Sequence, residues 1–429
     1  MKIMNRSRSV FIILLLLCSS LGSACAEEML TWNDCLAEAK INNPTLISAA
    51  EAVKQQKAGK AIAASSFYPQ INASADASTS KRDSGGSGSG TTSDSYSYGA
   101  SGSQLVFDGF KTLNDVKAAS ENINAAKENY RFTSSEVRLN LRNAFINLLR
   151  AQELVKVAEE IIKIRRDDYE LITLRYESGL EHKGSLLTSE ANLAQAELDL
   201  KQAKRDIEFA QRQLTQQLGR AKFVPMYVKA DFTVRDSARD KPDFEAIVKS
   251  NPSLLQAMAQ KNAANYGIKS AYGNFSPTIS GNANAGKSSS HWPPDDNQWN
   301  AGLSLSLPIF EGGLRLAQVS QAKATFAQAK ESERSTRDTA IVGLVETWAG
   351  LQDALDTVEV RRKQLVATEV RSKIAEAQYS TGFISFDDWI IIENNLVTAK
   401  RAYLESQANS LYTEASWVQA KGETLEYAQ

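Results

Sequence analysis

The sequence predicts a mainly α-helical protein with some β structure, in which two similar repeats each combine a long helical hairpin with a β-hairpin. Three observations support this fold class. Landmarks recur in the same order in both halves of the chain, long segments lack glycine and proline, and short segments alternate apolar with polar residues. A repeat of this length indicates that one supersecondary unit is used twice.

The two repeats, at 27–219 and 241–422, share short landmarks. These are Asn43-Pro44 with Asn251-Pro252, Phe107-Asp108-Gly109 with Phe310-Glu311-Gly312, Tyr176-Glu177-Ser178-Gly179 with Tyr379-Ser380-Thr381-Gly382, and Gly219 with Gly422. From the Phe-acidic-Gly landmark to the closing glycine the spacing is the same in both repeats, so the length difference lies before it. Residues 220–240 connect the repeats, and 423–429 form a C-terminal tail.

Glycine and proline usage predicts two long helices. The nine prolines avoid 70–224 and everything after 308, and 111–177 contains no glycine either. Its counterpart, 314–380, has only Gly343 and Gly350 as interruptions. At the rise of an α-helix each segment would be about 100 Å long. That length exceeds the depth of a globular domain and indicates a coiled coil or a helical tube.

Shorter helices are predicted on both sides of each long one. A tip at 178–186 or 381–387 contains glycine and leads into a return helix at 187–217 or 388–420. An opening helix at 44–66 or 252–273 starts at the proline of the Asn-Pro pair, a residue suited to the first helical position. By length, opening and return helices could stack end to end beside the long helix.

Period-two segments predict β-hairpins at 68–107 and 277–309. In the clearest case Trp299, Ala301, Leu303, Leu305 and Leu307 alternate with Asn300, Gly302, Ser304 and Ser306. This pattern is typical of a transmembrane β-strand, although a half-buried sheet in a soluble sandwich has the same alternation. Aromatic residues at the strand ends favour the membrane, where they would form interfacial girdles. They are Tyr68, Tyr96, Tyr98, Phe107, Phe275, Trp299 and Phe310.

Four strands per chain cannot close a membrane barrel, and open edges in lipid would leave backbone groups unsatisfied. Self-association is therefore predicted, with eight strands in a dimer or twelve in a trimer.

The N-terminus predicts export from the cytoplasm. Residues 1–26 resemble a signal peptide with a basic start, an apolar run at Val10–Leu17 and a cleavage site at Ala24-Cys25-Ala26. Lipidation of Cys25 is the alternative. With ordinary cleavage only Cys35 remains, which excludes a disulfide within the chain. A net charge of −1 argues against nucleic acid as a partner.

The order of these elements, with Asn-Asn-Pro-x-Leu near the start, the Phe-Asp/Glu-Gly landmarks and the Tyr-x-x-Gly tips, resembles the TolC-like outer-membrane efflux protein family. The resemblance covers about 31–422. It implies a homotrimer with a 12-stranded transmembrane β-barrel in outer-membrane lipid, continued by a long α-helical periplasmic tunnel. The implied function is a passive exit duct of a tripartite efflux pump or a type I secretion system. Its implied partners are a periplasmic adaptor and an inner-membrane transporter.

The resemblance also implies a gate at the tips of the second repeat. Asp388 lies where the family places a constriction aspartate, with Asp387 beside it, and Tyr379 belongs to the family's closing network. Three copies of Asp388 would form a carboxylate ring that attracts cations. Equally, an acidic residue at this place caps a helix, and both roles are compatible.

Three departures from the family pattern affect this gate. Ile384, Ile391 and Ser185 stand where the family has an arginine or an acid. We therefore expect a more hydrophobic closure, helped by His182 or Lys183 pairing with Asp387 or Asp388.

The remaining tip residues are expected either to pack at the end of the coiled coil or to contact the adaptor. They are Gly179, Leu180, Ser185, Gly382, Phe383, Phe386 and Trp389. Glu190 and Glu393, early in the return helices, are expected to set the register of the coiled coil.

No catalytic, cofactor or metal site is predicted, because His182 and His291 lie in turns without accompanying ligands or nucleophiles. A periplasmic adaptor is the alternative function. It would show one helical hairpin and no amphipathic membrane strands, whereas this chain has two of each.

Overall fold

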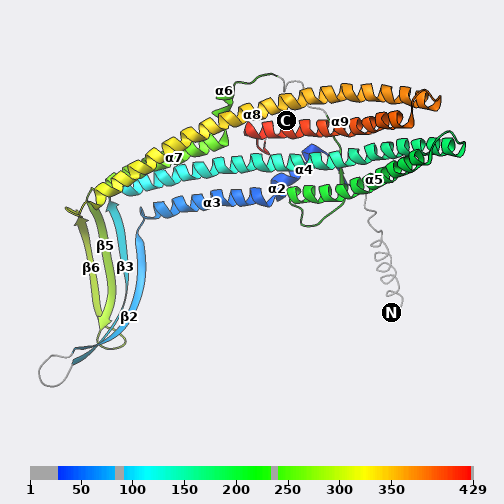
Figure 1. The fold of residues 1–429 in the computed structure, drawn as a ribbon. Coiled ribbons are helices and arrows are strands. Elements are labelled where there is room, and N and C mark those ends of the chain that lie inside the picture. The colour runs from blue at the N-terminus through cyan, green and yellow to red at the C-terminus, as the bar shows by residue number, and fades with distance from the viewer. Residues whose placement is uncertain (1–27, 83–90, 233–239, 427–429) are drawn as a thin grey trace, which may run out of the picture. The chain divides into compact units, whose positions relative to one another are not determined.

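The structure, a computed structural model, describes residues 28–82, 91–232 and 240–426 (Figure 1). The predicted signal peptide, and with it the question of Cys25, lies outside the described residues. Contacts divide the chain into two units, each built from parts of both repeats. The hairpin unit comprises Met1–Asn43, Asn140–Asp236 and Asp353–Ala415, and the sheet unit comprises Pro44–Leu139, Ser237–Gln352 and Ser416–Gln429.

Two long helices contribute to both units. Helix α4 spans Lys111–Glu177 and α8 spans Leu314–Ser380, with 67 residues in each. In the hairpin unit each reverses into a return helix, α5 at Lys183–Leu218 or α9 at Phe386–Ala420. The predicted fold class, with duplicated long helical hairpins and two β-hairpins, is confirmed. Both return helices begin earlier than we expected, because His182 and Ser385 cap them.

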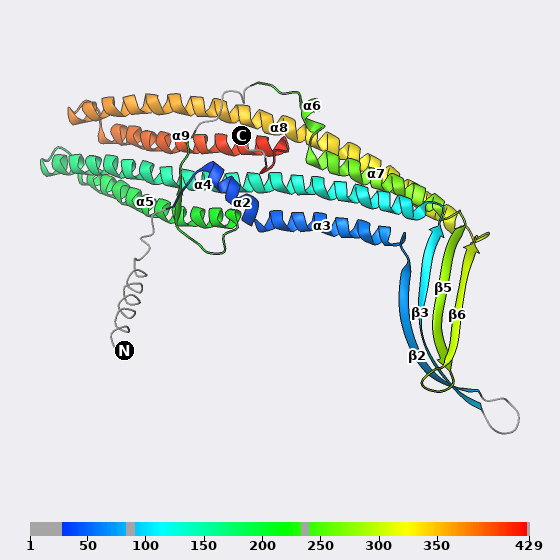
Figure 2. The same ribbon diagram turned by 180° about the vertical axis from the view of Figure 1, so that it is seen from behind.

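The sheet unit contains the opening helices α3 (Pro44–Ser65) and α7 (Pro252–Gly273) and four antiparallel strands. The strands are β2 (Gln70–Arg82), β3 (Thr91–Phe107), β5 (Thr278–Ser289) and β6 (Asp296–Ser306). Their order is β2-β3-β5-β6, so the hairpins of the two repeats join through β3 and β5 (Figure 2). The outer edges of β2 and β6 have no strand partner among the described residues.

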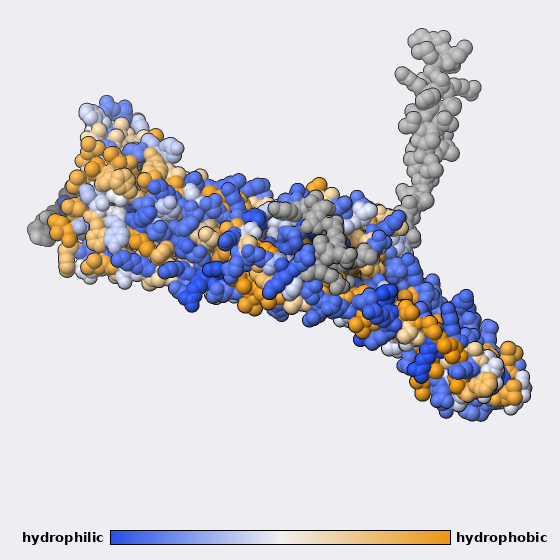
Figure 3. Space-filling view, turned by 90° about the horizontal axis from the view of Figure 1, so that it is seen from above, coloured by the Kyte–Doolittle hydropathy of each residue, from blue (hydrophilic) through white to orange (hydrophobic). Residues whose placement is uncertain are grey.

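The register of the sheet separates apolar from polar residues. Ala73, Ala100, Ala285 and Trp299 pair in one row across all four strands. The next row consists of Asn72, Ser101, Asn284 and Asn300. Neighbouring residues in a strand point to opposite faces, so these rows lie on opposite faces of the sheet. The space-filling view shows much apolar surface over the sheet, while the helical surface next to it is mostly hydrophilic (Figure 3).

The predicted aromatic residues lie at the two ends of this sheet. Tyr96, Tyr98 and Trp299 lie toward the hairpin turns, whereas Tyr68, Phe107, Phe275 and Phe310 lie where strands meet helices. Along β3, Tyr98 and Phe107 are about 30 Å apart at the rise of a β-strand. A strand tilted by about 40° would bring this separation to ~23 Å along the membrane normal, close to the ~25 Å apolar band of outer-membrane barrels.

The recurring asparagines lie where a return helix ends. In the hairpin unit the Asn43 side chain donates to the carbonyl of Gln217 at 2.9 Å. In the sheet unit Asn251 donates to the carbonyl of Ala420, the last residue of α9, at 3.3 Å. Carbonyls at a helix C-terminus lack partners within the helix, and these amides satisfy one in each repeat.

The closing glycines complete the same junctions. Gly219 and Gly422 both have positive φ, 77° and 80°. A Cβ on Gly219 would lie 2.2 Å from the carbonyl oxygen of Asn42, and one on Gly422 would lie 2.5 Å from Cδ of Pro252. In the sheet unit α9 therefore ends against the start of α7, which agrees with the end-to-end stacking expected for the second repeat.

The N-terminal part of the hairpin unit contains contacts that the sequence analysis did not anticipate. Strand β1 (Glu28–Leu30) pairs in parallel with β4 (Met226–Val228) from the connector, and α2 (Trp32–Asn42) follows β1. Arg220 binds the carboxylates of Glu28 and Glu38. The remaining helix, α6 (Phe244–Val248), lies in the sheet unit. None of the helices described here is long and apolar enough to span a bilayer.

Candidate functional site

The tips of the two hairpins, both in the hairpin unit, have the same turn. Gly179 and Gly382 have φ of 72° and 83°. The amide of the next residue, Leu180 or Phe383, donates back to the carbonyl of Arg175 or Gln378, at 2.8 Å in both tips. This is the hydrogen bond of a Schellman motif, which requires a left-handed residue and explains the recurring glycine.

An aromatic cluster lies directly below the second tip. The rings of Tyr379 and Trp389 stack with centroids 4.5 Å apart, and Phe386 meets both edge-on. Ile172 of the first hairpin belongs to the same buried cluster, with Leu171 and Leu186 packed against it. The indole N–H of Trp389 has no hydrogen-bond partner among the described residues. Packing, rather than polar contact, therefore holds this ring between the hairpins.

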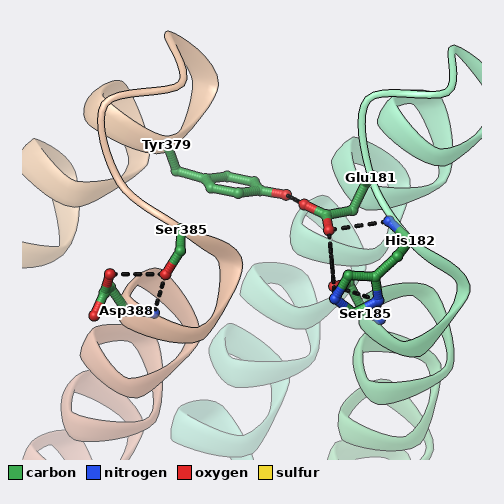
Figure 4. A network of polar contacts seen from close by, with 6 residues as sticks. All are labelled: Glu181, His182, Ser185, Tyr379, Ser385 and Asp388. Atoms are coloured by element: carbon green, nitrogen blue, oxygen red, sulfur yellow. Dashed lines mark hydrogen bonds and ion pairs between the residues drawn. The ribbon is translucent and has the colours of Figure 1, made fainter.

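A polar link joins the tips beside the aromatic cluster (Figure 4). The hydroxyl of Tyr379 donates to Glu181 of the first tip at 2.6 Å. Glu181 also accepts from the amide of His182 at 3.1 Å and from the hydroxyl of Ser185 at 2.9 Å. Burial disfavours ionisation of Glu181, but these hydrogen bonds outweigh burial and lower its pKa. Burial and the bond to Glu181 raise the pKa of Tyr379.

Arg175 of the first hairpin forms a second polar contact with the second tip. Its guanidinium lies 4.7 Å from the centre of the Tyr379 ring. Nη1 donates to the carbonyls of Tyr379 and Ser380, both at 3.3 Å. The C-terminus of α8 therefore ends against a positive charge, which its dipole favours.

Glu181 and Arg175 were not among the predicted gate residues. The resemblance implies an acid at position 185, where this chain has a serine. The structure shows that Ser185 is buried and donates to Glu181, which supplies the carboxylate from an earlier position in the turn. The sequence shows that Glu181 is a charged residue in the tip. Only the folded turn shows that its carboxylate reaches the hydroxyl of Tyr379.

Asp388 lies at the start of α9, and its carboxylate accepts from the Ser385 hydroxyl at 2.7 Å (Figure 4). The same hydroxyl accepts from the backbone amide of Asp388 at 3.2 Å. Ser385 thus caps the helix, and the Asp388 carboxylate holds the capping hydroxyl, so a single chain displays the helix-cap role. Asp387 and Asp388 are exposed, and the carboxylate ring stays a prediction. His182 caps α5 through Ser185.

The structure separates the residues expected to pack or to contact a partner. Phe386, Trp389 and Ser185 are buried within the hairpin unit. Leu180 and Phe383 are 68% and 82% exposed at the two tips. Among the large apolar residues predicted to contact the adaptor, Leu180 and Phe383 are therefore the two that a partner could touch without rearrangement of the tips. Within the described residues there is no cluster of side chains suited to a metal ion.

The chain is similar to known outer-membrane proteins. The sequence model of the family described as "Outer membrane efflux protein" matches 35–220 and 245–423. The outer membrane protein TolC of Escherichia coli is 26% identical over 212 residues, 45% of this chain and 43% of TolC. The efflux protein BepC of Brucella suis is 24% identical over 182 residues, 42% of this chain and 40% of BepC. Each match thus spans less than half of the relative.

Solved structures extend the likeness of fold to nearly the whole chain. The CmeC outer membrane channel of Campylobacter jejuni aligns with a TM-score of 0.80 at 19% identity, covering 91% of this chain and 85% of CmeC. The open state of the Neisseria gonorrhoeae MtrE channel aligns with 0.78 at 20% identity, covering 92% and 89%. Because the family model matches most of the sequence, this protein belongs to the outer membrane efflux protein family and is a protein of the bacterial outer membrane.

Proposed function

We propose that this protein is an outer-membrane exit duct that passively conducts substrates from a periplasmic adaptor and an inner-membrane pump to the exterior. The observation that carries the proposal is the register of the sheet, in which an apolar row and a polar row run across all four strands. One face therefore suits lipid and the other a water-filled lumen. The unpaired outer edges of β2 and β6 need partners in a membrane.

Closure of the barrel requires further copies of the chain. Three chains of four strands give a ring of twelve, and cyclic symmetry places β2 of one copy beside β6 of the next. In this homotrimer the helical hairpins continue the duct into the periplasm. We propose the same architecture whether the transporter belongs to a tripartite efflux pump or to a type I secretion system, because the transporter selects the cargo.

The periplasmic end would be gated by movement of the second hairpin against the first. The Tyr379–Glu181 hydrogen bond, the Arg175 contacts and the aromatic cluster hold these hairpins together in the structure. Parting the hairpins breaks these contacts. Exposed Leu180 and Phe383 are suitable contact points for the adaptor. In the trimer Asp388 would form a carboxylate ring while retaining its bond to Ser385.

The periplasmic adaptor remains the alternative function. Two helical hairpins and a four-stranded amphipathic sheet favour the duct. Under this proposal the protein transports without catalysing a reaction.

A matched pair of substitutions in β6 tests the proposal. Leu303 is 79% exposed on the apolar face, and Ser304 lies next to it on the polar face. Purified protein is placed in planar lipid bilayers. We expect step-like conductance for the native chain and Ser304→Lys, and loss of insertion for Leu303→Lys, because a lysine facing lipid costs about 2–4 kcal/mol at the midplane. Equal insertion of both variants, or no conductance by the native trimer, would overturn the duct.

A further inference from the structure

A second polar cluster lies deeper in the hairpin unit than the tip contacts. Arg165 and Asp168 come from α4, Ser372 from α8, and Glu393 and Asn394 from α9. The Arg165 guanidinium donates to the Asn394 side-chain oxygen at 2.5 Å and lies 3.5 Å from the Asp168 carboxylate. The Ser372 hydroxyl donates to Glu393 at 2.6 Å. The cluster therefore connects both helices of the second hairpin to the long helix of the first.

Negative charge exceeds positive charge in this cluster. Arg165, Asp168 and Glu393 are all buried, and Glu393 is only 3% exposed. The charged groups that act on Asp168 are Arg165 on the same helix, Glu393 on α9 and Glu376 on α8. The guanidinium of Arg165 is thus the one positive charge acting on the buried carboxyl groups of Asp168 and Glu393, and the carboxyl group of Glu376 adds a further negative charge. A buried carboxylate without a cation is costly, so the packed arrangement favours retention of a proton.

The protonation of the cluster differs from that of the tips. Burial, reinforced by repulsion from Glu393, raises the pKa of Asp168 to about 7. Burial likewise raises the pKa of Glu393. At the tips, hydrogen bonds lower the pKa of Glu181 instead.

We propose that Arg165, Asp168 and Glu393 form a proton-dependent lock, in which Arg165 positions α9 against α4 and loss of the cluster's proton releases the second hairpin. This inference rests on the proposed duct and its gate. Glu190, the counterpart of Glu393 in the first repeat, is exposed. The second hairpin alone therefore supplies a buried glutamate to the lock, which joins the two hairpins as a gate between them requires.

The direction of the pH effect follows from the raised pKa. When the hairpins part, water reaches Asp168 and its pKa falls toward the ordinary value of about 4. The closed state therefore binds the proton more tightly than the open state. Its extra stability is complete below the ordinary pKa and is lost as the pH rises through about 7. Between these limits the ratio of open to closed channels rises by up to about tenfold per pH unit.

Single-channel recordings of the full-length trimer between pH 5 and 8.5 test the lock. We expect the open probability of the native protein to increase with pH. Asp168→Asn, a neutral isostere, should abolish this increase and keep the channel closed. Glu393→Gln should shift the midpoint to lower pH, because it removes the charge that repels the Asp168 carboxylate. Glu190→Gln, at the exposed counterpart of Glu393 outside the cluster, should keep the native midpoint.

The outcomes separate the lock from the duct. A flat pH profile in a conducting native trimer would overturn the lock alone, as would an unchanged profile in Asp168→Asn. Absence of conductance at every pH would overturn the duct and the lock together. Size-exclusion chromatography of each variant in detergent verifies that the trimer is intact, so that a lost pH response reports on the cluster rather than on assembly.

Discussion

The two helical tips share one turn but differ in what they present to each other. Tyr176 and Tyr379 are equivalent landmarks, yet Tyr176 is 38% exposed and Tyr379 only 1%. Tyr379 donates a hydrogen bond to Glu181 and stacks against the guanidinium of Arg175, both on the first hairpin. The second repeat has isoleucine and glutamine at the positions equivalent to these two residues. The first tip alone therefore supplies the carboxylate and the guanidinium, and the tyrosine of the second tip is the one buried against them.

The aromatic cluster provides the largest expected difference between the tips. Trp389→Ala removes a stacked, buried indole and should destabilise the protein by about 3–5 kcal/mol. The comparison variant Phe383→Ala, at an exposed ring, should change stability by less than ~0.5 kcal/mol. Thermal unfolding of the detergent-solubilised protein measures both. Similar losses in the two variants would show that Phe383 is covered in the assembled protein.

The tyrosine pair tests the polar link directly. Tyr379→Phe removes a hydrogen bond to a charged acceptor, for which ~1.5–3 kcal/mol is typical. The open fraction of channels should increase about tenfold or more. Tyr176→Phe should leave it unchanged, because Tyr176 is 38% exposed and does not belong to the buried cluster that contains Tyr379. Single-channel recordings near neutral pH decide the matter, and equal effects would contradict the assignment of the link to Tyr379.

Acid should weaken the same link. The hydrogen bonds to Glu181 lower its pKa, so the stability that this carboxylate contributes is complete above its ordinary pKa of about 4.3. That contribution is lost as the pH falls through the lowered value. Glu181→Gln should remove this acid dependence, measured as the open fraction below pH 4. Protonation of Glu181 should open the channel, whereas protonation of the Asp168 cluster should close it. If the open fraction changes in only one direction as the pH falls, either the tip link or the lock is excluded.

The shared turn should give the smallest and most equal effects. Gly179→Ala and Gly382→Ala each place a side chain on a residue with positive φ, at a cost of about 1–2 kcal/mol. Neither new methyl group would meet another atom within 4 Å, so only backbone strain contributes. Thermal unfolding should therefore show matching losses. A much larger loss for Gly382→Ala would show that the second tip packs against another surface in the assembled protein.

Local patterns predicted most of the fold. The absence of glycine and proline from 111–177 indicated a continuous helix, and alternation at Trp299–Leu307 indicated which side chains share a face. Helix starts were less accurate, because His182 and Ser385 compete with later residues as caps. The pairing of β3 with β5 and of β1 with β4 involves residues far apart in the chain, so no local pattern could reveal it.

The sequence by itself determined the elements, their duplication and the faces of the strands, because helix formation and alternation depend on neighbours in the chain. Only the tertiary structure decided which side chains meet between the two hairpins. Glu181 reaches Tyr379, and Arg165 reaches Asn394, through contacts between hairpins distant in sequence. Burial also made the two glutamates of the return helices unequal, since exclusion of water raises the pKa of Glu393, whereas Glu190 lies exposed.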